Sequence, residues 1–307
     1  MNLTGRLGGR PVVAPLPGWA FGQPRRSSAA FLARRAVWKL ARQRRSSHKV
    51  ITPWLYGTTA QMVLSSDVGR CVWVAGCFEP NEIYVLSKVL PRGGTFVDVG
   101  ANIGLYSLAA ARIVGHDGKV LAFEPSARER ALLDRNIARN DLTQVVVDDR
   151  AVGDRRQGHA LLHLADDQHG GQNTLGSVVY ENVRLVGDAD VAVTTLDQAV
   201  ADHGLSRVHV VKIDVEGAEF AVLSGGRATL SISRPVLMME LQEDSLVAQG
   251  SGSAAVVEIL SEHSYEVYRY AEPGHRQLLR RLETGEADAS QDIVAVPVEA
   301  REPVVTL

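Results

Sequence analysis

Short apolar runs alternate with stretches of helical periodicity over most of the chain after Thr95. This alternation is typical of a parallel sheet covered by helices on both faces. Because no clear helical period separates the last two strands, we expect them to pair antiparallel, giving an α/β fold with a seven-stranded, mostly parallel sheet. The runs predict strands over residues 95–99, 119–123, 144–147, 208–215, 235–241, 265–270 and 293–296. The stretches between them predict helices over residues 105–114, 127–140, 196–203, 218–223 and 254–263.

The segments outside this alternation have patterns of their own. Residues 50–75 alternate like strands at 61–64 and 70–74, with Ser-Ser-Asp between them, which predicts a β-hairpin. A helical pattern follows over 83–90 and ends at Pro91 and Gly93-Gly94. Gly, Asp, His and Gln are frequent over 154–193, which predicts loops with two edge strands, a composition often found in substrate loops.

The amino-terminal region begins with a Gly- and Pro-rich stretch without periodicity, which predicts disorder. Ser27 and Ser28 then precede a helical pattern that extends to about Arg45. We expect this helix to dock on its own domain with a solvated basic face, and an anionic membrane surface or an acidic partner is the alternative. One side of the helix is an apolar stripe of Leu32, Ala33, Ala36, Val37 and Leu40, and the other carries Phe31, Trp38, Arg42 and Arg45.

These patterns divide the chain into five segments. We predict a disordered arm at 1–26, a basic amphipathic helix at 27–49, and a hairpin with a helix at 50–92. The main α/β domain then occupies 93–300, and a short tail covers 301–307.

Composition and charge limit the classes of partner. The chain of 307 residues is 45% hydrophobic, enough to bury a large core. Its formal charge of −2 conceals an asymmetry, because the first 49 residues hold eleven Lys or Arg and no acid. The remainder carries 22 basic and 35 acidic residues, which disfavours nucleic acid as a partner of the main domain.

Targeting and cysteine signals are few. Cys71 and Cys77 are too few for a disulfide framework or a four-cysteine zinc site, so we expect reduced structural thiols. No apolar run approaches the ~20 residues that span a bilayer. Arg25-Arg26 resembles a twin-arginine signal, but Arg34 and Arg35 interrupt the apolar stretch that should follow. The expected location is cytoplasmic, with peripheral membrane contact through the basic helix as an open alternative.

The first candidate site follows the strand over 95–99. There Asp98 ends a strand, a glycine turn follows, and a helix begins, so amide groups at the helix start can bind an anion. A dinucleotide site needs glycine where this chain has Asn102. The pattern therefore favours S-adenosylmethionine (SAM), with its carboxylate near the turn and its ammonium near Asp98. The predicted cofactor contacts in this turn are Asp98, Gly100, Ala101, Asn102 and Gly104.

The next two strands add candidate contacts to the same cofactor. Glu124 ends the second strand, where a carboxylate can accept both ribose hydroxyls, and Pro125 turns the chain into the following helix. Asp149 and Ala151 follow the third strand, and Asp149 could accept from the adenine amino group. A solvated acidic turn is the alternative there, because Asp148 and Asp149 are adjacent and leave the register open.

The strongest candidates for chemistry follow the apolar strand near 210. Asp214, Glu216 and Glu219 are released at the same sheet edge as Asp98, and Glu240 ends the next strand. An acceptor hydroxyl needs a base or a metal, because its pKa lies far above 7. Asp214 is the predicted base, with Glu216 as substrate holder or alternative base.

Several other polar residues near this edge have open roles. Glu216 and Glu219 could instead cap the following helix, and Lys212 could pair with a carboxylate inside the domain. His163 and His169 are alternative bases, although a surface position is favoured for both. An acidic cluster could hold a divalent cation, but no spacing requires one. The catalytic set is Asp214, Glu216 and Glu240, and the predicted substrate contacts are Glu79, Asn173 and Glu219.

Five short motifs occur in order along the chain. They are Asp-Val-Gly-Ala-Asn-Ile-Gly at 98–104, Ala-Phe-Glu-Pro at 122–125, Asn136 with Asn140, Thr195-Leu196-Asp197, and Lys-Ile-Asp-Val-Glu-Gly-Ala-Glu at 212–219. Together they resemble the FkbM family of SAM-dependent methyltransferases, over residues 76–297. The resemblance implies the class I, Rossmann-like methyltransferase fold and O-methylation of a macrolide, sugar or glycolipid hydroxyl. Phe78 stands where the family usually has tyrosine, and the basic arm lies outside the shared motifs.

Two other functions remain as alternatives. N-methylation of nucleic acid or protein typically uses an Asn-Pro-Pro-Tyr-like turn, where this chain has Asp214-Val215-Glu216-Gly217. A non-catalytic SAM-binding scaffold recruited through the basic helix is disfavoured by the acids at the strand ends. The expected partner is a small-molecule or glycan acceptor.

Overall fold

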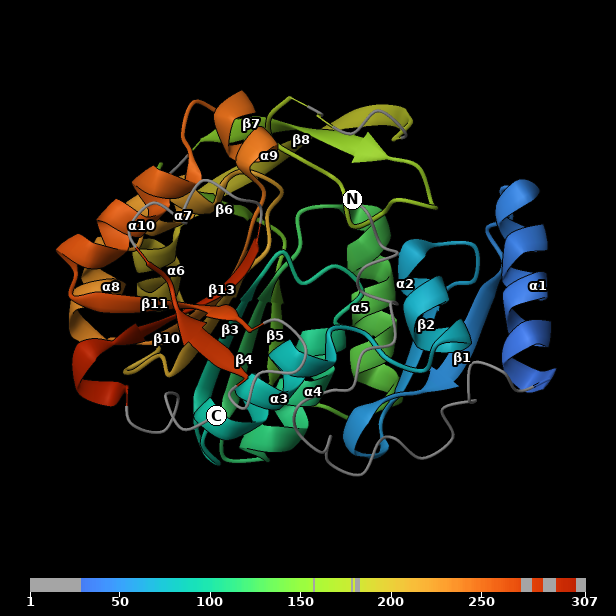
Figure 1. Cartoon of the computed structure of the whole chain (residues 1–307), viewed down its shortest axis with the longest axis horizontal. Helices are drawn as coiled ribbons and strands as arrows, with labels where there is room; N and C mark the ends of the chain where they lie inside the picture. Colours follow the sequence, from blue (N-terminus) through green and yellow to red (C-terminus); the bar gives the residue numbers. More distant parts are fainter. Residues whose placement is uncertain are drawn as a thin grey trace.

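The computed structural model describes residues 29–156, 158–177, 179, 183–271, 278–283 and 291–301. Its centre is an eight-stranded sheet in the order β12-β11-β13-β10-β9-β3-β4-β5 (Figure 1). The sheet has one more strand than predicted, the short β12, which pairs antiparallel with β11. The strands are β3 (Thr95–Val99), β4 (Lys119–Phe123), β5 (Val145–Asp148), β9 (Val210–Ile213), β10 (Val236–Leu241), β11 (Tyr265–Tyr270), β12 (Leu279–Arg281) and β13 (Gln291–Pro297).

The direction of the strands brings the candidate residues to one edge. Strands β5, β4, β3, β9 and β10 run parallel, with Asp98 level with Ala122 and Lys212. Strand β13 is antiparallel to both β10 and β11, as expected for the last two predicted strands. The carboxyl ends of β3, β4 and β9 therefore meet at one edge of the sheet.

Two apolar cores flank the sheet, one for each layer of helices. One contains side chains of α3 (Pro80–Val89), α4 (Leu105–Val114) and α5 (Ala127–Arg139). The other contains side chains of the carboxyl-terminal helices. These two layers confirm the predicted three-layer α/β fold (Figure 1). The second set of helices is α6 (Leu196–Asp202), α7 (Glu219–Ser224), α8 (Arg227–Ile232), α9 (Glu243–Ala248) and α10 (Ser253–Glu262).

A separate three-stranded sheet fills the region predicted to be loops with two edge strands. Strand β8 (Leu185–Thr195) lies between β6 (Ala151–Gly153), which is parallel to it, and β7 (His159–Ala165), which is antiparallel. Its small core includes Ala151, Leu162, Val191 and Val193. The two long strands therefore pair with each other outside the main sheet.

A hairpin lies in this region, but the predicted pairing of 61–64 with 70–74 across the Ser-Ser-Asp turn is wrong. Strand β1 (Lys49–Pro53) pairs with β2 (Thr59–Val63) around the short helix η1 (Leu55–Gly57). Residues Arg70–Val74 form the π-helical turn η2 after the short helix α2 (Asp67–Gly69). Ser66 caps α2 by accepting from the Gly69 amide, and a Cβ on Gly69 would lie 2.5 Å from the Leu64 oxygen. The missing side chain lets the helical turn pack directly on the end of β2.

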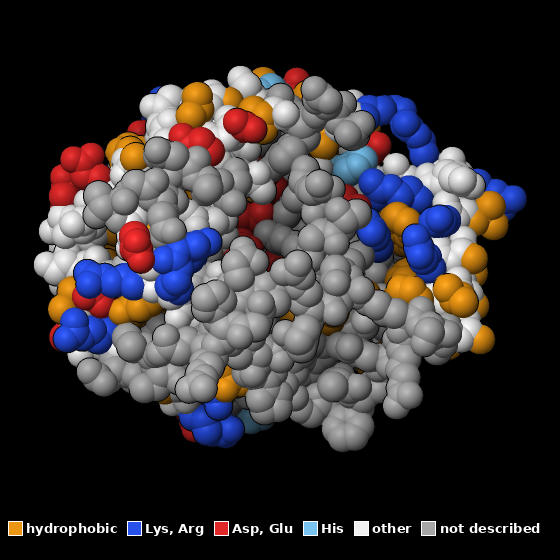
Figure 2. All heavy atoms as spheres, in the orientation of Figure 1, with side chains coloured by type: hydrophobic (Ala, Val, Ile, Leu, Met, Phe, Trp, Pro, Cys, Tyr) orange, Lys and Arg blue, Asp and Glu red, His pale blue; other side chains and the backbone are white. Residues whose placement is uncertain are grey.

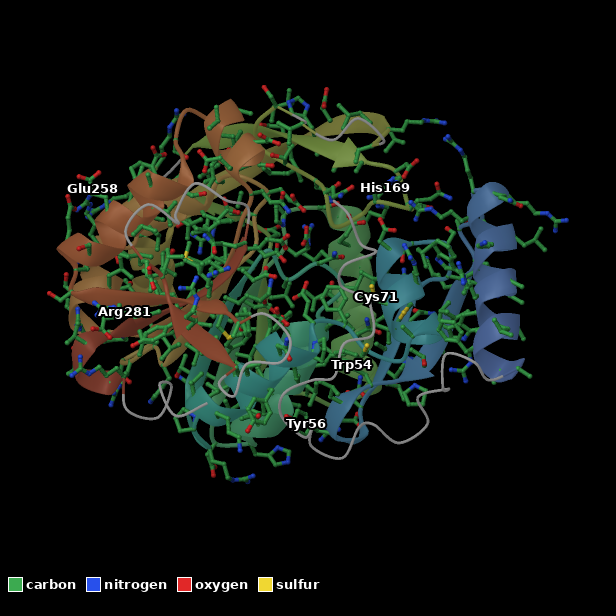
Figure 3. The ribbon with its side chains drawn as sticks, in the orientation of Figure 1. Trp54, Tyr56, Cys71, His169, Glu258 and Arg281 are labelled. Atoms are coloured by element: carbon green, nitrogen blue, oxygen red, sulfur yellow. The ribbon has the colours of Figure 1, made fainter. Side chains whose placement is uncertain are left out.

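Helix α1 (Ala29–Gln43) packs on the rest of the protein with its basic side, which was expected to be solvated. Trp38 is buried and donates to the Ser66 carbonyl, and Arg42 bonds Asp67 at 2.9 Å. Arg42 also lies 3.0 Å from His169, which is labelled between α5 and α1 in Figure 3. The expectation of a solvated basic face is therefore wrong, because ring and carboxylate partners on the body hold that face and leave the apolar stripe outward.

The chain ends and membrane signals add two facts. The predicted disordered arm, Ser27 and Ser28 lie outside the described residues, as does the tail after Arg301, where η3 (Val298–Ala300) has just ended. Within the described ranges, no helix combines the length and apolar character needed to cross a bilayer.

Candidate functional site

The glycine turn after β3 depends on two close approaches that exclude a side chain. At Gly100, φ is +84° and a Cβ would lie 1.9 Å from the Asp214 carbonyl oxygen. At Gly104, φ is +88° and a Cβ would lie 2.4 Å from Cδ1 of Leu133. Both positions therefore need glycine for conformation and for space. The first of them brings the ends of β3 and β9 into direct contact.

The amides of this turn are used within the protein. Those of Gly100 and Ala101 donate to the Phe123 carbonyl, and that of Gly104 donates to Ala101. Helix geometry leaves the first-turn amides of α4 without an intrahelical acceptor. An anionic ligand group would therefore bind at the start of α4, just beyond the glycines that the sequence indicated.

Asp98 is a buried acid at the end of β3. Its side chain is 1% exposed, and its Oδ2 accepts from Ser107 at 2.6 Å. Burial raises the pKa of Asp98, whereas Lys212 and the Ser107 hydroxyl oppose that rise. A carboxylate kept in so dry a place is stabilised by a cationic partner, and the ammonium of an amino acid group would supply one.

Glu124 occupies the corresponding place on β4. Its two oxygens accept from the amides of Asn102 and Ser126, each at 2.8 Å. Burial, reinforced by Glu129, raises the pKa of Glu124 to about 8. Arg130 donates to the carbonyls of Glu124 and Pro125 and fixes the entry into α5. The turn after β3 and the tip of β4 are thus joined through one carboxyl group.

The end of strand β5 shows which of the two adjacent acids, Asp148 and Asp149, is buried. Asp148 is the last residue of β5, where it is buried and bonds Arg150 and His203. Asp149 follows with a side chain 71% exposed and lies 4.0 Å from Arg130. Ala151 is buried in β6. The adenine contacts of Asp149 and Ala151 stay predictions, and the rim position of Asp149 fits its solvated alternative equally well.

A pocket lies at the carboxyl ends of β9 and β10, beside α3 and α4. Figure 2 shows acidic side chains deep in a hollow near the centre of one face. Two of the predicted catalytic residues, Asp214 and Glu240, and one predicted substrate contact, Glu79, line this pocket. Its lining residues are Glu79, Glu82, Tyr106, Lys212, Asp214, Met238, Met239, Glu240, Tyr270, Asp292 and Ile293.

Lys212 and Asp214 form an ion pair in this pocket. The Nζ of Lys212 lies 2.7 Å from Oδ2 of Asp214 and 4.6 Å from the ring centre of Tyr106. Burial favours the neutral amine, but Asp214, Glu79 and Asp98 outweigh it and raise the pKa of Lys212. The predicted pairing of Lys212 with a carboxylate is confirmed. The pair supplies a fixed positive charge beside a carboxylate that lines the pocket.

A second polar pair closes the other side of the pocket. The hydroxyl of Tyr106 donates to Oε2 of Glu79 at 2.6 Å, and Oε1 of Glu240 accepts from Gln242 at 2.9 Å. The hydroxyl of Tyr270 is buried and has no hydrogen-bond partner among the residues that the structure describes. A polyhydroxyl ligand would find carboxylate acceptors and a phenol donor in this pocket.

Two predicted site residues, Glu219 and Glu216, shape the backbone after β9 and do not line the pocket. Oε1 of Glu219 accepts from the amides of Val215 and Gly217, so the capping alternative describes it better. Glu216 has φ of +54°, and its carbonyl accepts from Thr174 and Gln249. Both therefore shape the turn that carries Asp214.

The remaining candidates lie in β7, which contains His163, and in the segment after it, which contains His169 and Asn173. Asn173 bonds Glu129, Gly170 and the Ala165 amide, which ties the loop to itself and to α5. His163 pairs with Asp188, and His169 pairs with Asp166. Neither histidine lines the pocket described above. Their positions do not favour the alternative that either one is the base.

Sequence reasoning from the residues alone missed the roles of two asparagines on α5. Asn136 accepts from the Gln61 amide and donates to the carbonyls of Gln61 and Ile103. Asn140, one turn later, accepts from the Thr59 amide and donates to its carbonyl. The two side chains act as a substitute strand beside β2 and connect the hairpin to the glycine turn. Their spacing of four on a polar helix was the available signal.

The motif Thr195-Leu196-Asp197 has a structural role, because two of its side chains bind backbone amides at helix starts. Thr195 caps α6 by accepting from the Gln198 amide. The carboxylate of Asp197 accepts from the amides of Ala228 and Thr229 at the start of α8. These contacts stabilise two helix amino termini away from the pocket.

The comparison with family models agrees with this geometry. The model described as "Methyltransferase FkbM domain" matches residues 98–267, more than half of the chain. The chain belongs to the FkbM methyltransferase family. The matched FkbM domain begins at Asp98 and includes both buried strand-end acids and the Lys212–Asp214 pair. The residues present fit SAM, because the amides at the start of α4, Asp98 and Glu124 match its carboxylate, ammonium and ribose.

Known relatives of this FkbM-family chain include two curated proteins. The methyltransferase sdnD of Sordaria araneosa is 31% identical over 160 residues, covering 44% of this chain and 61% of that protein. The AMB antimetabolite synthetase AmbE of Pseudomonas aeruginosa is 30% identical over 219 residues, covering 61% of this chain. The chain spans only 10% of AmbE and about three-fifths of sdnD.

A solved structure of similar description was also found. The FkbM methyltransferase of Methylobacillus flagellatus is 18% identical, with a TM-score of 0.41. The match covers 68% of this chain and 47% of that chain.

Proposed function

We propose that this FkbM-family chain transfers a methyl group from SAM to a hydroxyl oxygen of a small natural product or sugar. The observation that carries the proposal is the double position of Asp214. Its carbonyl oxygen lies against Gly100 of the cofactor turn, and its side chain lines the acidic pocket. One residue thus joins the donor side to the acceptor side over the length of a single side chain.

The chain's own residues divide the work of binding the donor. SAM, when bound, supplies an electrophilic methyl group on a positively charged sulfur. The α4 amides and Asp98 would hold its amino acid end, and the Glu124 carboxyl would hold the ribose. Because Asp98 and Glu124 are buried, their hydrogen bonds to the donor would form with little competition from water. The acids of the pocket also favour a positively charged donor over its neutral product.

The acceptor would be activated by Asp214 and positioned by its neighbours. Asp214 would take the proton of the acceptor hydroxyl. Lys212, whose Nζ lies 2.7 Å from Oδ2 of Asp214, would stabilise the negative charge that develops on the acceptor oxygen. Glu79 and Tyr106 would bind further hydroxyls of the acceptor. Sterically, the direct contact of β3 with β9 keeps the donor and acceptor sides close, as an in-line displacement requires.

Two features support a small acceptor. The pocket is lined by side chains of several strands and helices, and one relative of the chain is an antimetabolite synthetase. A natural-product hydroxyl is consistent with both. The alternatives of N-methylation and of a non-catalytic scaffold have no specific supporting contact in the pocket.

The test uses SAM labelled in its methyl group and a small-molecule extract from a deletion strain. We expect label on an oxygen of one hydroxyl compound, located by mass spectrometry and by the carbon shift of the new methyl. Asp214→Asn should abolish the product, whereas the control Asp244→Asn, on the exposed side of α9, should not. Label on nitrogen would contradict the proposal. SAM binding without transfer to any compound in the extract would favour the scaffold.

A further inference from the structure

Helix α1 carries an apolar face that points away from the protein. Leu32, Val37 and Leu40 are 53%, 48% and 46% exposed, the values of surface residues. The alanines between them are exposed as well. We call this the outward apolar face, and it consists of Ala29, Leu32, Ala33, Ala36, Val37 and Leu40.

The opposite side of α1 fixes this orientation. The Trp38 indole donates to the Ser66 carbonyl at 3.1 Å and lies between the guanidinium groups of Arg42 and Arg70, at 5.4 and 5.3 Å. Arg34 donates to the Trp73 carbonyl and stacks over its ring. Four of these contacts join α1 to the rest of the protein, two from Trp38 and two from Arg34, and all four would be lost if the helix turned its leucines inward.

Basic side chains surround the outward apolar face. Arg35, Lys39 and Arg44 are exposed, and the structure gives them no ion pair among the described residues. Figure 2 shows blue and orange side chains side by side along the edge of the molecule where α1 lies. The first 49 residues contain no acid to neutralise this charge. Exposed leucine and valine beside unpaired cations are the composition of an interfacial helix.

We propose that α1 docks on an anionic lipid bilayer with the outward apolar face buried among the lipids. A helix of 15 residues, about 22 Å long, can lie in the interface plane with its basic flanks at the headgroups. A second copy of the chain fits this face poorly, since pairing two identical helices would bring Arg35, Lys39 and Arg44 close to their own counterparts. An acidic protein would match the charge but leaves the apolar stripe unexplained.

The experiment is co-sedimentation of the full chain with vesicles of phosphatidylcholine alone or mixed 3:1 with phosphatidylglycerol. We expect at least about tenfold stronger partitioning onto the anionic vesicles, and loss of most of it at high salt. Leu32→Gln, Val37→Gln and Leu40→Gln combined should reduce this binding at least about tenfold. Arg35→Glu, Lys39→Glu and Arg44→Glu combined should do the same.

A matched control separates the helix from exposed apolar surface in general. Ile232, 80% exposed at the end of α8, lies far from α1 along the chain, so Ile232→Gln should bind vesicles like the unchanged protein. All variants should keep the thermal midpoint and the SAM affinity of the parent, since their side chains are exposed.

Three results would overturn the proposal. The first is absence of vesicle binding by the unchanged protein at low salt, and the second is unchanged binding after the apolar triple substitution. The third is a dimer, seen by light scattering, that the same substitution dissociates, which would assign the face to a second copy. Binding of an acidic protein by a chain that does not bind vesicles would also overturn the proposal.

Discussion

The proposed donor and acceptor sides of the site are built by different means. On the donor side, Glu124 is held by two backbone amides, and the turn around Gly100 permits no side chain. On the acceptor side, Asp214 and Glu79 are held by the side chains of Lys212 and Tyr106. The donor geometry therefore belongs to the backbone, whereas acceptor geometry can change by substitution without moving a strand.

The largest expected effect is on the acceptor side. Asp214→Asn should lower kcat by about 100-fold or more, because the general base is removed. The Kd for SAM should stay within about threefold, since the side chain faces the acceptor pocket. Single-turnover kinetics and calorimetry on the same preparation measure the two quantities. A parallel loss of SAM affinity would show that the two sides are not separable at Asp214.

On the donor side, a substitution in the glycine turn should lower the stability of the fold. Gly100→Ala places a Cβ 1.9 Å from a backbone oxygen, so the β3–β9 contact must open. We expect a loss of about 3 kcal/mol or more in the free energy of unfolding. Chemical denaturation measures it.

Gly57→Ala is the matched control for this substitution. Gly57 has φ of +76° with nothing within 4 Å of its missing Cβ, so it isolates the conformational cost of about 1 kcal/mol. Equal losses at Gly57 and Gly100 would mean that the close approach to Asp214 is unimportant.

The sequence predicted the donor side well because the backbone determines it. Strands β3, β4 and β11 and helix α4 have the predicted bounds, and Asp98 and Glu124 stand at adjacent strand ends as expected. Turn glycines and strand-end acids are local signals, and parallel topology alone brings them together. The same reasoning placed Asp214 and Glu240 at the correct edge.

The sequence predicted less where several elements meet. Residues 70–74 alternate like a strand, but a Ser66 cap and the small Gly69 convert them into a helical turn against β2. Helix α1 was assigned the wrong face, because the partners of Trp38 and Arg42 come from η2 and α2. From the sequence, the side chains of Glu219 and Asn173 could bind a ligand in a pocket or the backbone of a turn. Only the fold shows which backbone amides they bind.

A smaller effect is expected where the hairpin meets the donor turn. Asn136 is fully buried, and Asn136→Ala leaves the amide of Gln61 and the carbonyl of Ile103 without their partner. We expect a loss of about 2 to 3 kcal/mol in unfolding free energy. Hydrogen exchange should increase at the Gln61 amide, which loses its acceptor, and at the Gly104 amide, whose bond to Ala101 lies in the turn that Asn136 holds through Ile103. An unchanged exchange rate at Gly104 would show that the hairpin and the turn are independent.

The smallest effect concerns the pH dependence of the donor side. The folded-state pKa of Glu124 is raised from its usual 4.5 to about 8 by burial. Its contribution to stability is therefore complete below 4.5 and is lost as the pH rises through 8. The thermal midpoint of Glu124→Gln minus that of the unchanged protein should rise by a few degrees between pH 4.5 and pH 8. Above pH 8 this difference should stay constant.

Glu219→Gln is the comparison for this titration. Burial raises the pKa of Glu219 to about 7, so its difference curve should level off about one pH unit earlier. Melting curves by circular dichroism between pH 5 and 9 give both differences. A flat difference for Glu124 would mean that its two amide donors already keep it ionised in the free protein.

The central claim is that the α4 amides, Asp98 and Glu124 form one site for SAM, and isothermal calorimetry tests it most directly. The unchanged chain, titrated with SAM, should release heat with a Kd in the micromolar range. Glu124→Ala should weaken that binding by about 1.5 to 3 kcal/mol. The absence of any binding heat from the unchanged chain, or identical affinity after Glu124→Ala, would contradict the account.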